Sequence, residues 1–159
     1  MVHHKAIVYP CVDIGENVYI GPGCIIGAPP EHKAFWGKSS LYKVIIKSGT
    51  ILTGNVCIDQ GTTSDTIIGK DCFIMKGAYI AHDCKIGDGV IISAGVSLAG
   101  YVEIGERTNL GMNSSVHQHL KVPSGCMIGM GATIIRKTEL NKDGVYVGNP
   151  AKFIRWNQR

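Results

Sequence analysis

Aliphatic side chains recur every six residues along most of this chain. Stepping by six from Ile68 meets an aliphatic residue at each of twelve positions up to Ile134, and shorter runs with the same step precede this one. A glycine follows many of these residues, and a small or β-branched residue stands two positions before them. Neither the 3.6-residue period of a helix nor the two-residue alternation of a strand repeats every six residues with this asymmetry. The period therefore predicts short strands separated by sharp corners.

The composition agrees with one strand-rich domain. Among 159 residues there are 34 Ile and Val against 6 Leu, and β-branched side chains favour strands. The net charge is +4, with no dense Lys/Arg run before the last quarter, so we expect no nucleic-acid partner. Charged residues and Gly interrupt every apolar stretch, which predicts no membrane span and no secretory signal. We therefore expect a cytoplasmic protein.

The repeated pattern of an aliphatic residue, Gly, two variable residues and a small residue resembles the hexapeptide-repeat superfamily. This resemblance implies an all-β, left-handed parallel β-helix in which three hexads make one triangular turn. We expect the β-helix over residues 1–136, with excursion loops at about 28–43 and 60–66, where the period stops. A C-terminal loop and tail should follow over 137–159.

Four of the six cysteines fall in the small slot of the hexad, which we expect to face inward: Cys24, Cys72, Cys84 and Cys126. No Cys-x-x-Cys pair is present to suggest zinc or redox chemistry. We therefore expect reduced core thiols rather than a disulfide framework.

Polar residues gather on one side of the predicted helix, because faces recur every 18 residues. The hexads that begin at Ile80, Leu98 and Val116 stack on this side. They carry His82, Asp83, Gly100, Tyr101, His117 and Gln118. The wall of a neighbouring subunit could complete a cleft there, so we expect a homotrimer with active sites between subunits.

The stretch Ala78–Gly87, with its His-Asp-Cys motif, resembles the UDP-N-acetylglucosamine O-acyltransferases of lipid A synthesis, as do residues 98–101 and 115–118. The same motif, with Gly-Asn-Pro-Ala-Lys at 148–152, resembles sugar acetyltransferases that use acetyl-CoA. Both resemblances imply acyl transfer to an amine or hydroxyl of a nucleotide-linked sugar. The sequence ends without the helical region that follows the repeats in the lipid A enzymes. We therefore expect acetyl-CoA as the donor, with acyl-ACP (acyl carrier protein) and O-acylation as the alternative.

Acyl transfer from a thioester needs a base for the attacking group and a hydrogen-bond donor for the oxyanion. His82 is the candidate base, because a free imidazole titrates near pH ~6.5. The resemblance implies that Asp83 orients this imidazole and that the Gly100 N–H is the oxyanion donor.

The resemblance also implies the binding residues. The family has substrate-binding histidines where this chain has Tyr79 and Tyr101, and the remaining substrate-binding candidates are Glu31, Lys33, His117 and Gln118. The candidates for the coenzyme A phosphates are Lys137, Lys152 and Arg155. We expect no metal ion.

Two other functional classes remain open at this point. One is a zinc enzyme of the carbonic-anhydrase type, with His82, His117 and His119 as ligands. The other is a non-catalytic β-helix scaffold, although a bare scaffold needs neither the polar loop at 28–43 nor a His-Asp corner.

Overall fold

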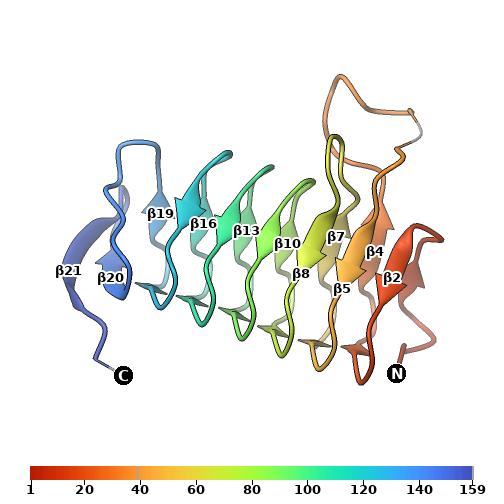
Figure 1. Ribbon diagram of the computed structural model, residues 1–159, viewed down its shortest axis with the longest axis horizontal. Coiled ribbons are helices and arrows are strands. Elements are labelled where there is room, and N and C mark those ends of the chain that lie inside the picture. The colour runs from red at the N-terminus through yellow and green to blue at the C-terminus, as the bar shows by residue number, and fades with distance from the viewer. Residues whose placement is uncertain (39, 159) are drawn as a thin grey trace.

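The structure is a computed structural model that describes residues 1–38 and 40–158. In these residues the chain forms 21 short strands and no helix, and its coils stack along one long axis (Figure 1). Two residues of the predicted segments lie outside the described residues: Ser39 in the loop at 28–43, and Arg159 at the end of the tail.

The strands form three sheets, one on each side of the coil. The first sheet runs in the order β1 (Ile7–Val8), β4 (Ile25–Ala28), β7 (Cys57–Asp59), β10 (Tyr79–Ile80), β13 (Ser97–Leu98), β16 (Ser115–Val116) and β19 (Thr133–Ile134). The second runs in the order β2 (Val12–Ile14), β5 (Val44–Ile46), β8 (Thr66–Ile68), β11 (Lys85–Ile86), β14 (Glu103–Ile104) and β17 (Lys121–Val122). The third runs in the order β3 (Tyr19–Ile20), β6 (Ile51–Leu52), β9 (Phe73–Ile74), β12 (Ile91–Ile92), β15 (Asn109–Leu110), β18 (Met127–Ile128), β20 (Gly144–Val147) and β21 (Lys152–Trp156).

The strand register confirms the predicted 18-residue turn. Ile80 pairs in parallel with Leu98, and Leu98 pairs in turn with Val116. From β1 to β20, consecutive strands lie in different sheets, so the backbone turns corners between them. The chain is an all-β, left-handed parallel β-helix, as the sequence predicts.

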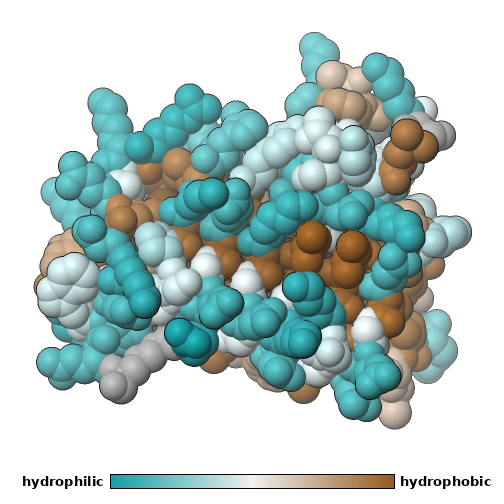
Figure 2. Space-filling model, viewed as in Figure 1, coloured by the Kyte–Doolittle hydropathy of each residue, from teal (hydrophilic) through white to brown (hydrophobic). Residues whose placement is uncertain are grey.

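The aliphatic residues of the six-residue period fill the interior. None of the twelve from Ile68 to Ile134 is more than 3% exposed. Each fully buried aliphatic side chain contributes roughly 1.5–3 kcal/mol, so this column is the main stabilising term of the fold. The four cysteines of the small slot are buried in the same core, and among the described residues no disulfide joins any of the six cysteines. Figure 2 shows an apolar band crossing one long face between hydrophilic side chains.

Two loops leave the coil on the same side, where Figure 1 shows them projecting beside β4 and β7. The longer loop joins β4 to β5, and the shorter joins β7 to β8. They are tied together where Ser40 Oγ donates a hydrogen bond to the Gly61 carbonyl at 2.6 Å, and where the Lys43 N–H donates to Asp65 Oδ1 at 2.8 Å.

The segment predicted as loop and tail adds another strand to the coil. Strand β20 pairs in parallel with β18, because Val145 and Tyr146 turn inward and are 3% and 0% exposed. Strand β21 then folds back antiparallel to β20 and is exposed along its length. Within the described part of the chain, no helix is long and apolar enough to cross a lipid bilayer.

Candidate active site

His82 and Asp83 lie together at the corner between β10 and β11. Both are buried, and His82 Nδ1 lies 2.8 Å from Asp83 Oδ2. On a straight strand, neighbouring side chains point to opposite faces. Here Asp83 has a φ of 61°, in the left-handed region that Asp tolerates better than most residues. The corner therefore permits the His-Asp contact.

The Asp83 carboxylate is held by the turn at residues 62–64, in the shorter loop. Thr62, Thr63 and Ser64 each donate a backbone N–H and a side-chain hydroxyl to it, over 2.6–3.2 Å. Burial alone would raise the pKa of Asp83, but hydrogen bonds from Thr62, Thr63 and His82 outweigh burial and lower the pKa. Asp83 therefore stays ionised and acts only as an acceptor.

An ionised Asp83 fixes the tautomer of His82. Since the carboxylate can only accept, Nδ1 carries the hydrogen, and Nε2 of the neutral ring keeps a free lone pair. A histidine in this state can take a proton from a nucleophile at Nε2.

Gly100 lies against the face of the His82 ring, one coil further along the axis. A Cβ at position 100 would be 2.5 Å from His82 Cε1 and 2.8 Å from Nε2, so only glycine fits. Among the described residues, the Gly100 N–H has no acceptor. A free donor beside the lone pair of His82 is what an oxyanion site requires.

Asp83, Tyr101 and His119 form a column at 18-residue spacing. All three have left-handed φ values, of 61°, 63° and 62°. The rings of Tyr101 and His119 are stacked, with centroids 4.4 Å apart and an interplanar angle of 8°. The Tyr101 ring meets His82 edge to face, with centroids 5.1 Å apart. The left-handed conformation costs a side chain such as Tyr roughly 1–2 kcal/mol, so Tyr101 is the strained member of this column.

The longer loop brings His32 over His82. Their rings meet edge to face with centroids 5.4 Å apart, and His32 Nδ1 accepts a hydrogen bond from the Ala34 N–H at 3.2 Å. The sequence analysis did not single out His32, although it named Glu31 and Lys33 on either side. Those two side chains are exposed.

The buried Asp59 and the half-buried Tyr79 form a second pair beside the first. The Tyr79 hydroxyl lies 2.6 Å from Asp59 Oδ2, which also accepts the Glu31 N–H at 3.3 Å. Asp59 is 1% exposed, and burial raises its pKa. Burial and the Asp59 hydrogen bond raise the pKa of Tyr79 well above its usual range, so the phenol keeps its hydrogen. The sequence reasoning missed Asp59, which has no motif of its own.

An open groove of about 310 Å³ runs along β10, β13, β16 and β19, and we call it the β10–β19 groove. Its walls include Tyr79, Ala99, Ser115 and His117. Ala99 precedes Gly100, so one end of the groove reaches the His82 corner. His117 and Gln118, both predicted as binding residues, are exposed beside it.

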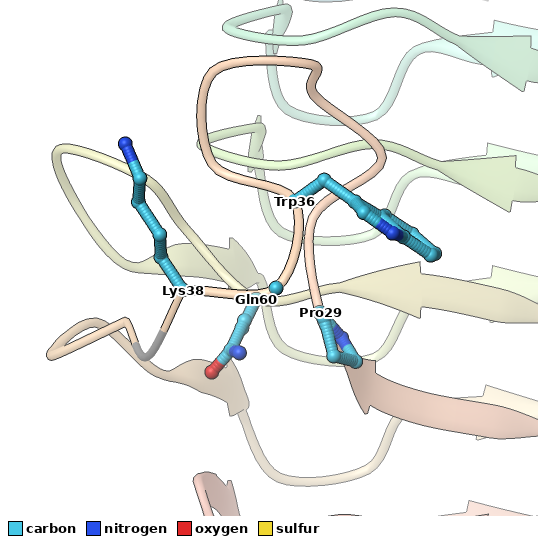
Figure 3. A pocket seen from close by; sticks show the side chains of 5 residues that line it. Pro29, Trp36, Lys38 and Gln60 are labelled. Carbon is cyan, nitrogen blue, oxygen red and sulfur yellow. The ribbon is translucent and has the colours of Figure 1, made fainter.

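A larger hollow of about 400 Å³ lies under the longer loop (Figure 3). Pro29, Trp36, Lys38 and Gln60 surround it. None of the residues that line it belongs to the His82–Asp83 corner. This hollow therefore does not reach the His82–Asp83 corner, whereas the β10–β19 groove does.

The predicted coenzyme A residues lie apart from this corner. Lys152 and Arg155 are on β21, in a different sheet from β10, and Lys137 follows β19 in an exposed turn. Across residues 1–38 and 40–158, no group of three His, Cys, Asp or Glu side chains is placed to hold a metal ion. The His82, His117 and His119 set of the zinc alternative is not such a group.

Two family models match adjacent stretches of the repeats. "Bacterial transferase hexapeptide (six repeats)" matches residues 65–100, and "Hexapeptide repeat of succinyl-transferase" matches residues 101–136. The chain belongs to the hexapeptide-repeat superfamily. The acyl-[acyl-carrier-protein]–UDP-N-acetylglucosamine O-acyltransferase of Helicobacter pylori is a relative, 35% identical over 133 residues, which are 82% of this chain and 46% of that protein. This hexapeptide-repeat chain thus spans about half the length of the curated relatives it matches.

Other relatives of this hexapeptide-repeat chain differ in the group they acylate. The UDP-3-O-acylglucosamine N-acyltransferase of Bordetella pertussis is 29% identical over 157 residues, covering 93% of this chain and 43% of that protein. Among solved structures, the UDP-N-acetylglucosamine acyltransferase of Bacteroides fragilis matches with a TM-score of 0.81 at 26% identity, over 99% of this chain and 75% of that one. Perosamine N-acetyltransferase of Caulobacter crescentus, solved with CoA and GDP-perosamine, shares the fold at a TM-score of 0.63 and 23% identity. The match covers 97% of this chain and 55% of that one.

Proposed function

We propose that this chain transfers an acyl group from a thioester to a sugar linked to a nucleotide, with His82 as the general base. The observation that carries the proposal is the free lone pair of His82 Nε2 beside the free N–H of Gly100. A base and an oxyanion donor on adjacent coils are the two groups that acyl transfer needs. The names of the relatives support the same reaction class.

The proposed reaction proceeds through a tetrahedral intermediate. His82 Nε2 takes the proton of the attacking group, whose lone pair forms a bond to the thioester carbonyl carbon. The carbonyl oxygen becomes an oxyanion that accepts the Gly100 N–H. When the carbonyl re-forms, the C–S bond breaks and His82 returns the proton to the leaving sulfur. Asp83 stays ionised throughout and stabilises the charged imidazole.

Within this proposal we favour acyl-ACP as the donor and a UDP-linked glucosamine as the acceptor. The H. pylori relative carries both in its name. Acetyl-CoA, expected from the sequence, keeps support from the fold of the perosamine enzyme alone. We assign Tyr79, Tyr101, His117 and Gln118 to the sugar or the acyl arm.

A homotrimer is part of the proposal. The β10–β19 groove is open on one side, and His117 and Gln118 are exposed there. A neighbouring copy would close the groove and exclude water from the thioester. Light scattering on the purified chain should give three times the mass of 17.1 kDa; a monomer at working concentration contradicts this part.

The test of the function is product formation. The chain is incubated with acyl-ACP or acetyl-CoA and UDP-linked glucosamine derivatives, and mass spectrometry detects the acylated sugar. His82→Ala should lower the rate at least 1000-fold, whereas His4→Ala, an exposed histidine near the N-terminus, should leave it unchanged. A His82→Ala variant that keeps the wild-type rate would overturn the assignment.

A further inference from the structure

The hydrogen bonds around His82 fix the direction of the Tyr101 hydroxyl. The Thr62 hydroxyl lies 2.6 Å from Asp83 Oδ2 and must donate to it, because an ionised carboxylate only accepts. Thr62 Oγ1 therefore has only lone pairs to offer to the Tyr101 hydroxyl at 2.8 Å. Tyr101 must donate there, and its oxygen faces its remaining surroundings only as an acceptor.

The hydrogen-bond direction of the Tyr79 hydroxyl is fixed in the same way. It donates to Asp59 Oδ2, so its oxygen also offers only lone pairs to the β10–β19 groove that it lines. A carboxylate partner polarises the phenol and strengthens it as an acceptor. Among the described residues, Asp59 Oδ1 has the Cys57 thiol, 4.0 Å away, as its side-chain partner, so the hydrogen bonds to this buried carboxylate fall mainly on Oδ2.

His117 extends the set of acceptors. Its Nδ1 lies 3.2 Å from the carbonyl oxygen of Gln118, which can only accept. Nδ1 therefore carries the hydrogen, and Nε2 of the neutral ring keeps a lone pair. The exposed Glu31 carboxylate is a further acceptor on the longer loop, and the backbone N–H of Glu31 donates to Asp59. Donors near these acceptors include the Gly100 N–H, assigned above to the oxyanion, the Nε2–H of neutral His32, the Gln118 amide and the Thr133 hydroxyl.

We propose that the group acylated by this chain is an amino group on the nucleotide-linked sugar rather than a hydroxyl. The inference rests on the proposed function and specifies its acceptor. A hydroxyl brings one hydrogen, which His82 Nε2 removes, and it leaves the lone pairs of Tyr79 and Tyr101 without partners. An amine brings two hydrogens and an ammonium three, so the amino group can engage a tyrosine oxygen together with His82.

The transfer to an amine balances without another reactant. An ammonium first releases one proton to solvent. The lone pair of the neutral amine then attacks the thioester carbon, and His82 takes one of the two remaining hydrogens as a proton. Collapse of the intermediate breaks the C–S bond, forms the amide and returns that proton to the sulfur.

The experiment compares two sugars that differ by an amine in place of one hydroxyl. UDP-N-acetylglucosamine and its analogue with an amine in place of the 3-hydroxyl are each given to the full chain with acyl-ACP and, separately, with acetyl-CoA. We expect kcat/KM for the amine to exceed that for the hydroxyl at least 100-fold. Equal or faster acylation of the hydroxyl sugar overturns this inference and leaves the proposed function standing. Acylation of neither sugar by either donor overturns both.

Variants test the groups that carry the preference. Asp59 is a positioning residue that acts through Tyr79, so Asp59→Asn should lower the amine-to-hydroxyl ratio of kcat/KM at least 10-fold. Tyr79→Phe keeps the ring and should lower the ratio similarly, which covers the case in which Asp59→Asn does not fold. Asp88→Asn is the matched control, since Asp88 also accepts a backbone N–H, from Lys70 at 2.8 Å, outside the site. Folded Asp59→Asn and Tyr79→Phe proteins with the wild-type ratio would contradict the assignment.

Discussion

The backbone of Gly100 lies so close to His82 that a methyl group at position 100 would be 2.5 Å from the Cε1 atom of the imidazole. Real Cβ contacts are never this short, so the ring would have to move. The Nδ1 atom of this ring is hydrogen-bonded to Asp83, and moving the ring would break or distort this hydrogen bond. The two residues therefore form one unit in which the glycine sets the position of the base.

Gly100→Ala should consequently lower kcat at least 100-fold while the β-helix persists. Position 100 has no left-handed φ, so the backbone accepts alanine and the effect falls on the ring. Gly111→Ala is the control, because a Cβ there would meet Met130 N at 2.7 Å but no residue of the site. Steady-state kinetics with circular dichroism would check this prediction, and a Gly100→Ala enzyme with wild-type kcat would contradict it.

Asp83→Asn should destabilise the fold in a pH-dependent way. The folded-state pKa of Asp83 is lowered below its unfolded value of about 3.9. The carboxylate therefore stabilises the fold above that unfolded pKa, and the stabilisation is lost as the pH falls through the folded pKa. We expect Asp83→Asn to lower the free energy of unfolding by roughly 1–3 kcal/mol at pH 7. This difference from wild type should become smaller below pH ~4.

Urea unfolding of wild type and Asp83→Asn at pH 7 and pH 3 would measure this difference. The exposed Asp88→Asn should differ from wild type by less than about 0.5 kcal/mol at pH 7. A free-energy gap for Asp83→Asn that widens on acidification would be inconsistent with the lowered pKa.

Thr62 and Tyr101 should be coupled in catalysis. Thr62→Val removes a hydroxyl that donates to Asp83, and Tyr101→Phe removes the hydroxyl that donates to Thr62. Each single variant should lower kcat about 10-fold. The double variant should lower kcat by much less than 100-fold, because the effects of substitutions within one hydrogen-bond network do not add. Thr108→Val, which also removes a buried hydroxyl, should leave kcat unchanged. Full additivity of the two changes would argue against a shared network.

Cys84 in the core and the half-buried Cys57 should resist alkylation in the folded protein. Burial raises the pKa of Cys84 to about 12 and that of Cys57 to about 11, so neither forms much thiolate at pH 8. Mass spectrometry after iodoacetamide should find both unmodified in the native protein and modified in urea. Rapid modification of native Cys84 would show that this part of the coil opens.

The fold was predictable because one local rule repeats. Each aliphatic residue from Ile68 to Ile134 occupies an equivalent buried position, so the hexad alone specifies sheet, face and register. His82 and Gly100 could be placed on adjacent coils for the same reason. Tyr146 and its neighbours, past the last regular hexad, joined the coil without that pattern.

The partners of the site residues were not predictable, since loops supply them. Asp83 takes its donors from residues 62–64, and His82 meets a ring from position 32. These contacts depend on the path of segments that lack the repeat. One signal was available: Thr-Thr-Ser offers three hydroxyls and three N–H groups in a row, which suits a carboxylate.

The 18-residue return of each face also limits how such a protein can change in length. Deleting a single hexad between Thr62 and His82 would turn everything beyond it by about a third of a revolution and carry the imidazole away from its donors. Deleting a whole coil beyond His119 would merely shorten the rod. An insertion that projects from a corner, as the segment 28–43 does, leaves the register of the following strands unchanged. New binding elements can thus be acquired without disturbing the alignment of the residues already in place.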